Sequence, residues 1–256
     1  MKVVIKIGTS TLAHPGGRLN IRNVEELVKV LADLKNAGHE IIIVSSGAIG
    51  MGIGKLNMDR AHMDIPAKQA AAAVGQCELM HTYDTLFLRY SHTVGQILIT
   101  SEDIDDPERR ANFENTMKTL LECGAIPVVN ENDTVATTEI NSVGDNDTLG
   151  AIVAKAIDAD VLILMSDIDG LFTADPNKDP DARLIETVEE ITMEIEAFAG
   201  DAGSELGTGG MATKIGAAQM VTQSGCDMVI INGNNPDKLY DIVEGKSAGT
   251  LFRAVR

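Results

Sequence analysis

Five carboxylates crowd one short stretch of the chain, residues 130 to 147, which reads NENDTVATTEINSVGDND and contains no lysine or arginine. They are Glu131, Asp133, Glu139, Asp145 and Asp147. The stretch follows an apolar run, residues 126 to 129, that reads as a strand. Ligands of α/β proteins bind beyond the carboxyl ends of strands, and oxygen-rich loops there suit an ammonium group or a metal ion. The pattern also fits a solvated hairpin turning near residues 142 to 144, so the loop alone leaves both interpretations open.

Three glycine-rich segments could each cradle a phosphate group: residues 7 to 10 (IGTS), 45 to 52 (SSGAIGMG) and 207 to 214 (GTGGMATK). The third opens an expected helix, whose free N–H groups and dipole favour an anion. None has the spacing of a Walker A loop or of the GxGxxG turn of dinucleotide-binding dehydrogenases. One such turn is weak evidence, but three in one chain favour a nucleotide-binding protein.

Two lysines stand where a phosphate could meet them. Lys6 lies in an apolar strand, where it could either act on a ligand or belong to a solvated strand face together with Lys2 and Val4. Lys214 falls in the first turn of an expected helix, where the dipole disfavours a cation unless an anion is near. The placement of Lys214 therefore indicates phosphate contact, whereas the pattern around Lys6 leaves both interpretations open.

Strands and helices alternate along the chain, which predicts an α/β fold with a mainly parallel sheet covered on both faces. The expected strands are residues 2–7, 40–45, 96–100, 126–129, 161–165 and 228–231. The expected helices are residues 24–37, 67–90, 107–123, 147–156 and 210–224, with a short one from Pro236. We expect one domain with two lobes and a hinge near Gly150.

Composition excludes several classes of protein. The formal net charge of −17 repels nucleic-acid backbones, and the 3% aromatic content without tryptophan gives little base-stacking surface. No apolar stretch approaches the roughly 18 residues that span a bilayer, and the N-terminus does not read as a signal peptide. Three scattered cysteines fit reduced thiols, with Cys123 expected to be buried. We therefore expect a cytoplasmic protein that binds neither nucleic acid nor membrane.

Seven motifs occur together in one order: KIGTS (6–10), SSGAI (45–49), NEND (130–133), VGDND (143–147), SD (166–167), GLFTADP (170–176) and GTGGMATK (207–214). Over nearly the whole chain this set resembles the glutamate 5-kinases of the amino acid kinase superfamily. The resemblance implies a three-layer α/β/α fold, with a glutamate-binding lobe at about residues 1–150 and an ATP-binding lobe at about residues 151–256. The chain ends at Arg256 soon after these motifs, so we expect no RNA-binding-like PUA domain, which many members carry.

The resemblance also implies an activity: MgATP-dependent phosphorylation of the γ-carboxylate of L-glutamate to γ-L-glutamyl 5-phosphate, the first step of proline biosynthesis. The catalytic residues it implies are Lys6, Asp147 and Lys214. The substrate-binding residues are Ser46, Asp133 and Asn146. The ATP-binding residues are Lys6, Ser166, Asp167, Thr208, Gly209, Gly210, Met211, Ala212, Thr213 and Lys214. Mg²⁺ would come with ATP, and we assign no protein side chain as a metal ligand. Position 166 holds serine where threonine is common in the family, a change that keeps the hydroxyl group.

Further partners follow from the same resemblance: a homo-oligomeric assembly, proline as a feedback inhibitor and functional coupling to glutamyl phosphate reductase. Two alternatives stay open. One is a sibling kinase for acetylglutamate, aspartate, carbamate or UMP, and the other is a non-catalytic amino-acid sensor that keeps the fold. The NEND and VGDND motifs point away from the siblings. The retained lysines and the GTGG turn point away from the sensor.

Overall fold

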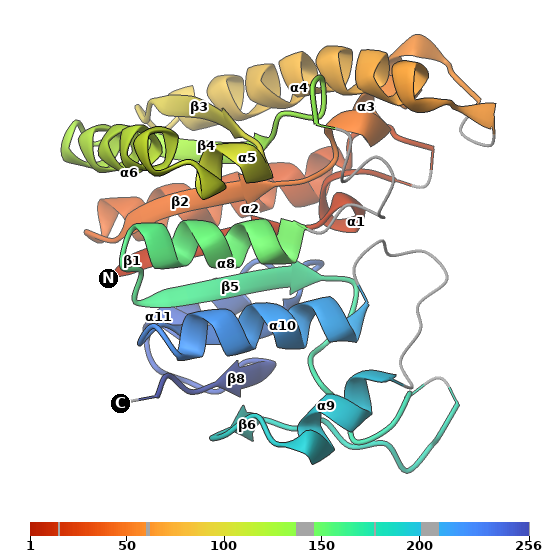
Figure 1. The fold of residues 1–256 in the computed structure, drawn as a ribbon, viewed down its shortest axis with the longest axis vertical. Coiled ribbons are helices and arrows are strands. Elements are labelled where there is room, and N and C mark those ends of the chain that lie inside the picture. Colours follow the sequence, from red (N-terminus) through yellow and green to blue (C-terminus); the bar gives the residue numbers. More distant parts are fainter. Residues whose placement is uncertain (15, 60–61, 137–145, 177, 201–209, 256) are drawn as a thin grey trace.

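The protein is described by a computed structural model that covers residues 1–256 except 15, 60–61, 137–145, 177, 201–209 and 256. Its centre is one eight-stranded sheet with the order β3-β4-β2-β1-β5-β7-β8-β6 (Figure 1). The strands are β1 (Lys2–Ile7), β2 (Glu40–Ser45), β3 (Val94–Ile99), β4 (Ile126–Glu131), β5 (Val161–Ser166), β6 (Thr187–Val188), β7 (Asp227–Asn232) and β8 (Thr250–Phe252). The pairings are parallel except that of β7 with β8, so the expected mainly parallel sheet is confirmed.

Helices cover both faces of this sheet. They are α1 (Thr9–Leu12), α2 (Ile21–Asn36), α3 (Ala48–Leu56), α4 (Ile65–Leu88), α5 (Ser101–Asp105), α6 (Pro107–Glu122), α8 (Asn146–Ala156), α9 (Met193–Gly200), α10 (Met211–Thr222) and α11 (Lys238–Val243). Apolar residues of α2, α4 and α11 form one core with one face of the central strands. Residues of α6, α8 and α10 form a second core on the opposite face. The arrangement is the expected three-layer α/β/α sandwich.

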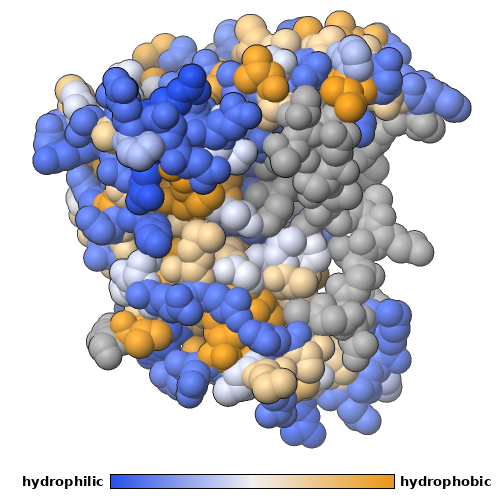
Figure 2. All heavy atoms as spheres, viewed as in Figure 1, coloured by the Kyte–Doolittle hydropathy of each residue, from blue (hydrophilic) through white to orange (hydrophobic). Residues whose placement is uncertain are grey.

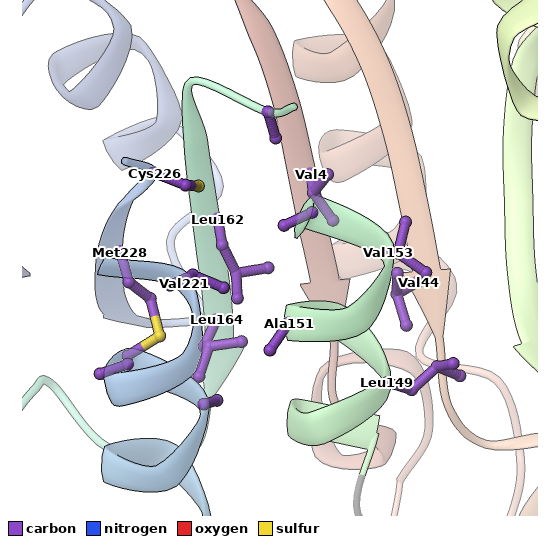
Figure 3. Packing of buried hydrophobic residues seen from close by; sticks show 14 of the residues in the cluster. Val4, Val44, Leu149, Ala151, Val153, Leu162, Leu164, Val221, Cys226 and Met228 are labelled. Carbon is purple, nitrogen blue, oxygen red and sulfur yellow. The ribbon is translucent and has the colours of Figure 1, made fainter. Parts of the chain in front are cut away.

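The core on the α8 side packs α8 and α10 against the sheet. In Figure 3 side chains from α8, α10 and the strands meet; the labelled ones include Val4, Val44, Leu149, Ala151, Val153, Leu162, Leu164 and Val221. The central strands are buried on both faces, which explains why they read as continuous apolar runs in the sequence. Burial of this kind stabilises the fold by about 25 cal/mol per Å² of apolar surface, and it holds α8 and α10 against the sheet.

Several elements were not predicted from the sequence: α1, α3, α5, α9, β6 and β8. In the glycine-rich segment 45 to 52, the chain turns at Gly47 and enters α3 at Ala48, so its role in phosphate binding stays a prediction. A Cβ added to Gly52 would lie 1.8 Å from the backbone oxygen of Ala71, and one on Gly75 would lie 1.7 Å from that of Ala48. These glycines therefore allow α3 and α4 to pack backbone against backbone.

The two halves of the chain share the sheet. Strand β1 pairs with β2 on one side and with β5 on the other, so it lies between the two expected lobes. Gly150, the expected hinge, lies inside α8, where an added Cβ would be 3.3 Å from Leu162 and 3.5 Å from Lys6. Its missing side chain lets α8 approach the sheet closely. The division into lobes at residue 150 and the absence of a PUA domain stay predictions.

The face of the molecule seen in Figure 2 is largely polar. Figure 2 shows hydrophilic residues over much of the visible face, with apolar residues in separate areas between them. Within the described part of the chain, no helix is long and apolar enough to cross a membrane. Cys77, Cys123 and Cys226 are free thiols. Cys226 is buried but Cys123 is exposed, so its expected burial was wrong; it follows the last turn of α6 on the solvent side.

Candidate active site

One carboxylate and two ammonium groups meet at the carboxyl ends of the central strands. The Nζ atom of Lys6 lies 2.7 Å from Oδ1 of Asp147, and the Nζ atom of Lys214 lies 2.9 Å from its Oδ2. The relative exposures are 9% for Lys6, 0% for Asp147 and 3% for Lys214. Because a buried charge needs compensation, each oxygen of the carboxylate holds one lysine in place. The three residues predicted to be catalytic are thus brought together.

In this cluster the Asp147 carboxylate is an anion held between two ammonium cations. Burial by itself would raise the pKa of Asp147, but the charges of Lys6 and Lys214 outweigh it and hold the pKa below its ordinary value. Asp147 is therefore ionised at neutral pH. The cluster carries one net positive charge, counting these three side chains, in a buried position. Such a cluster attracts an anion.

Strand register and helix packing explain the position of Lys6. In β1 it pairs with Val44 of β2 and Leu164 of β5, and its side chain lies on the α8 side of the sheet. Val4, on the same side, is fully buried. The alternative of a solvated strand face for Lys6 was therefore wrong, because α8 covers that face and Gly150 lets it come close to the lysine.

Two helix N-termini converge on the cluster. Asp147 lies in the first turn of α8, where a negative charge suits the helix dipole. Lys214 lies in the first turn of α10, where the sequence required an anion nearby, and the structure supplies Asp147 as one. Thr213 adds a third contact, because its hydroxyl lies 3.2 Å from Oδ2 of Asp147 and 2.8 Å from the backbone oxygen of Gly210. The two helices are thereby joined through one carboxylate.

A second polar cluster adjoins the first, because it is built around Asn146, the residue before Asp147. The side-chain amide of Asn146 donates to the hydroxyl of Ser46 over 2.8 Å and lies 3.3 Å from the backbone oxygen of Ser45. Ser46 follows β2, and Gly47 after it has φ 97°, a left-handed conformation that suits glycine and lets the chain turn at once into α3. Two of the three predicted substrate-binding residues are therefore in direct contact.

The third predicted substrate residue, Asp133, lies in the turn that follows β4 and is buried, as is Glu131 before it. Burial at this end of the acidic stretch argues against the solvated hairpin, at least for residues 130 to 133. Residues 137–145, which include Glu139 and Asp145, lie outside the described part, so the remainder of that interpretation is not tested.

The predicted ATP-binding residues that the structure describes lie along the same edge of the sheet. Ser166 ends β5, and its hydroxyl donates to Oδ1 of Asp167 over 3.0 Å. Gly210 is the N-cap of α10, and Met211, Ala212, Thr213 and Lys214 form its first turn. Thr208 and Gly209 lie outside the described residues. Ser166 and the start of α10 thus lie at the same edge of the sheet, and their roles in ATP binding stay a prediction.

No metal-binding cluster of three or more His, Cys, Asp or Glu side chains occurs among the residues that the structure describes. Asp147, the carboxylate at the centre of the site, already holds two lysines.

Sequence reasoning missed several residues of this second polar cluster. The amide of Asn130 donates to Gln76 and accepts from Asn146. Tyr83 is fully buried, and its hydroxyl lies 3.0 Å from that of Ser45, while burial raises its pKa well above the ordinary value. A glutamine and a tyrosine on the buried side of the apolar helix α4 were the signal that could have revealed them, because buried polar groups require partners.

Comparison with known proteins gives this geometry a family. A model described as "Amino acid kinase family" matches residues 1–232, and the chain belongs to that family. It is 53% identical over 254 residues to a glutamate 5-kinase of Clostridium tetani, a match that covers 99% of this chain and 95% of the relative. It is 50% identical over 254 residues to one of Listeria monocytogenes, which covers 98% and 92%. Within the family, the chain therefore belongs with the glutamate 5-kinases, as the sequence motifs predicted.

Solved structures support the fold independently of sequence. A carbamate kinase from Giardia lamblia bound to AMP-PNP is 17% identical, with a TM-score of 0.70 over 99% of this chain and 98% of that one. A UMP kinase from Ureaplasma parvum is 16% identical, with a TM-score of 0.64 over 98% of each chain. At these identities the likeness concerns the fold alone.

Proposed function

We propose that this protein transfers the γ-phosphoryl group of ATP to the γ-carboxylate of L-glutamate, giving γ-L-glutamyl 5-phosphate and ADP, the first step of proline biosynthesis. The observation that carries the proposal is the buried Lys6–Asp147–Lys214 cluster, in a chain about half identical to glutamate 5-kinases over nearly its whole length. Both lysines approach one point from different elements, as a transferring phosphoryl group requires.

The chemistry needs no general base. A γ-carboxylate is already ionised at neutral pH, so one of its oxygens can form the new bond to the γ-phosphorus directly. The bond from that phosphorus to the bridging β–γ oxygen breaks, and ADP leaves with the electron pair. What opposes the reaction is repulsion between two anions, together with the entropy of aligning them. The contribution required of the protein is therefore positive charge in a fixed position.

Lys6 and Lys214 supply this charge in the proposed mechanism. Their ammonium groups would contact the phosphate oxygens and stabilise the charge that develops during transfer. Asp147 acts as an organiser, since its lowered pKa makes it a poor proton acceptor and its two oxygens hold the two lysines apart. Mg²⁺, arriving with ATP, would neutralise further phosphate charge.

Substrate recognition is assigned to the second cluster. We propose that Ser46, Asp133 and Asn146 hold L-glutamate, with an acidic side chain and amide oxygens suited to its ammonium group. ATP is assigned to Ser166, Asp167 and the segment from Thr208 to Lys214. The support is positional: Ser46 and Asn146 lie on the β2 side of the lysine cluster, and Ser166 ends β5 on the other side of β1.

A substrate panel tests this function. With MgATP, L-glutamate should be turned over and trapped by hydroxylamine as its γ-hydroxamate, with release of ADP. Aspartate and N-acetylglutamate should be poor substrates, because the first has the wrong reach and the second lacks the ammonium group. Faster turnover of N-acetylglutamate would favour an acetylglutamate-kinase-like enzyme. Glutamate binding without ADP release would favour a non-catalytic sensor.

Several further properties belong to the same proposal. We infer a glutamate-binding lobe at about residues 1–150 and an ATP-binding lobe at about 151–256, meeting at β1. Proline is proposed as a feedback inhibitor that competes with glutamate, and a homo-oligomer and coupling to glutamyl phosphate reductase are also proposed. A cytoplasmic location is supported by the three free cysteines. Proline titration at several glutamate concentrations tests the competition, and a sedimentation measurement tests the oligomer.

A further inference from the structure

A chain of side-chain amides runs from the substrate cluster into helix α4. Asn146 donates through Nδ2 to Oδ1 of Asn130 over 3.2 Å. Asn130 donates in turn through its own Nδ2 to Oε1 of Gln76 over 2.9 Å. All three residues are buried, with relative exposures of 7%, 2% and 8%. The amide groups therefore form a relay that ends at Gln76, a residue with no role in the proposed mechanism so far.

The backbone fixes the direction of this relay. Nδ2 of Asn146 lies 3.3 Å from the carbonyl oxygen of Ser45, and a carbonyl can only accept a hydrogen bond. The NH₂ group of Asn146 must therefore face the carbonyl and Asn130, which requires Asn130 to present its oxygen to Asn146. The NH₂ group of Asn130 then faces Gln76, so Gln76 must present its oxygen. Each amide orientation follows from the network rather than from an arbitrary choice between oxygen and nitrogen.

The orientation leaves one acceptor unused. Oδ1 of Asn146 is buried and, among the described residues, has no hydrogen-bond partner. Buried polar atoms without a partner are rare and costly, so their occurrence in a ligand site indicates a group that the ligand satisfies. A carbonyl oxygen accepts from a donor such as the ammonium group of an amino acid. Reversal of the Asn146 amide would offer that ammonium an NH₂ group instead, which cannot accept.

We infer that Gln76 is a positioning residue for substrate: its Oε1 holds Asn130, which in turn holds Asn146 with its acceptor oxygen toward the substrate ammonium. The inference rests on the proposed function, because it assumes that Asn146 contacts an amino acid. It adds a specificity determinant in α4 that the motifs did not reveal.

Helix α4 is closely packed beside Gln76. Its neighbour Gly75 packs so close to α3 that an added Cβ would lie 1.7 Å from the backbone oxygen of Ala48, two residues after Ser46. Helix α4 is thereby fixed against the turn that carries Ser46. Gln76 therefore holds Asn130 from a helix that packs closely against the start of α3.

Two substitutions separate the contact from simple packing. Gln76→Met keeps the length of the side chain but removes the acceptor for Asn130. Gln76→Glu keeps an acceptor oxygen in place of Oε1 and loses Nε2, which is buried and has no hydrogen-bond partner among the described residues. Gln96→Met, on the exposed side of β3, is the matched control for the exchange of glutamine for methionine.

We expect Gln76→Met to raise KM for glutamate by about tenfold or more, the scale of a buried hydrogen bond lost from the ground and transition states alike. The kcat value and KM for ATP should stay within about threefold, because the lysine cluster is untouched. Gln76→Glu should recover a large part of the KM for glutamate, and Gln96→Met should match the parent. Thermal unfolding of each variant separates loss of fold from loss of binding.

The double variant gives a second, independent measurement. If Gln76 acts through Asn130, then Gln76→Met should change KM for glutamate little further in an Asn130→Ala background, since effects along one path are not additive. A parental KM for glutamate in Gln76→Met would overturn the inference. So would a change in kcat and in KM for ATP as large as the change in KM for glutamate. Effects of Gln76→Met and Asn130→Ala on KM for glutamate that are fully additive in free energy would overturn it as well. A Gln76→Glu variant as weak as Gln76→Met would also overturn it. A parent that does not phosphorylate glutamate at all would instead overturn the proposed function.

Discussion

Asn146 and Asp147 are consecutive residues at the start of α8, yet their side chains join two different clusters. Asn146 donates to Ser46 and Asn130 on the β2 and β4 side. Asp147 holds Lys6 of β1 and Lys214 of α10. A single helix N-terminus therefore carries both the residue proposed to hold the substrate and the residue proposed to organise phosphoryl transfer, at a separation fixed by one peptide unit.

The first prediction concerns chemistry at Asp147. Asp147→Asn keeps the shape but removes the charge that aims Lys6 and Lys214, so kcat should fall by about 10²-fold or more while both KM values change less. Steady-state kinetics with glutamate and ATP varied separately measure this. Asp158→Asn is the matched control, because Asp158 is exposed near the other end of α8 and its φ of 51° suits asparagine equally well. A parental kcat for Asp147→Asn would contradict the proposed role.

The same carboxylate should make stability depend on pH. The pKa of Asp147 is lower in the folded protein than in the unfolded chain, because two lysines favour its charged form. The unfolded chain therefore binds a proton first as pH falls, and the stabilisation, fully present above about pH 4, is lost below it. Urea unfolding between pH 7 and pH 3 should show a decline for the parent that is shallower for Asp147→Asn. An identical pH dependence in both proteins would contradict the ion-pair argument.

Asp133 should affect binding rather than chemistry. Asp133→Ala should raise KM for glutamate by about tenfold or more, with kcat and KM for ATP close to the parent, because an ammonium contact persists through the reaction. Val135→Ala, two residues further and exposed, serves as the control. If Asp133→Ala leaves KM for glutamate unchanged, the acidic turn does not hold the substrate.

The contact between α3 and α4 should tolerate no side chain. Gly75→Ala would place a Cβ 1.7 Å from the backbone oxygen of Ala48, so the helices must separate, at a cost of about 2 kcal/mol or more of unfolding free energy. Gly216→Ala, in α10, is the control, since its added Cβ would meet none of the described atoms within 4 Å and should stabilise the helix by up to about 1 kcal/mol. Chemical denaturation measures both. Equal stability of the two variants would show that the helix crossing adapts.

Some of this protein could be read directly from its residues. Apolar runs such as residues 40 to 45 defined the central strands, because a strand buried on both faces has no polar side. The expected helix beginning at 147 and the one at 210 were each within one residue of the observed start. The motifs around Lys6, Asp147 and Lys214 identified the family, because each is a short run of consecutive residues and the motifs occur in one order along the chain.

What lay beyond the sequence depended on contacts between distant segments. The burial of Lys6 followed from α8, which covers its face of the sheet, and no pattern within residues 2 to 7 could indicate that. Gly52 stood in a glycine-rich segment and Gly75 in the expected helix 67–90, and only the backbone of the facing helix showed the reason for their missing side chains. The relay to Gln76 joins residues 54 positions apart, and its direction depends on one carbonyl group of a third segment. Local propensity and spacing follow from neighbours along the chain, whereas the pairing of charges and amides is decided by the packing that brings strand, turn and helix ends to one edge of the sheet.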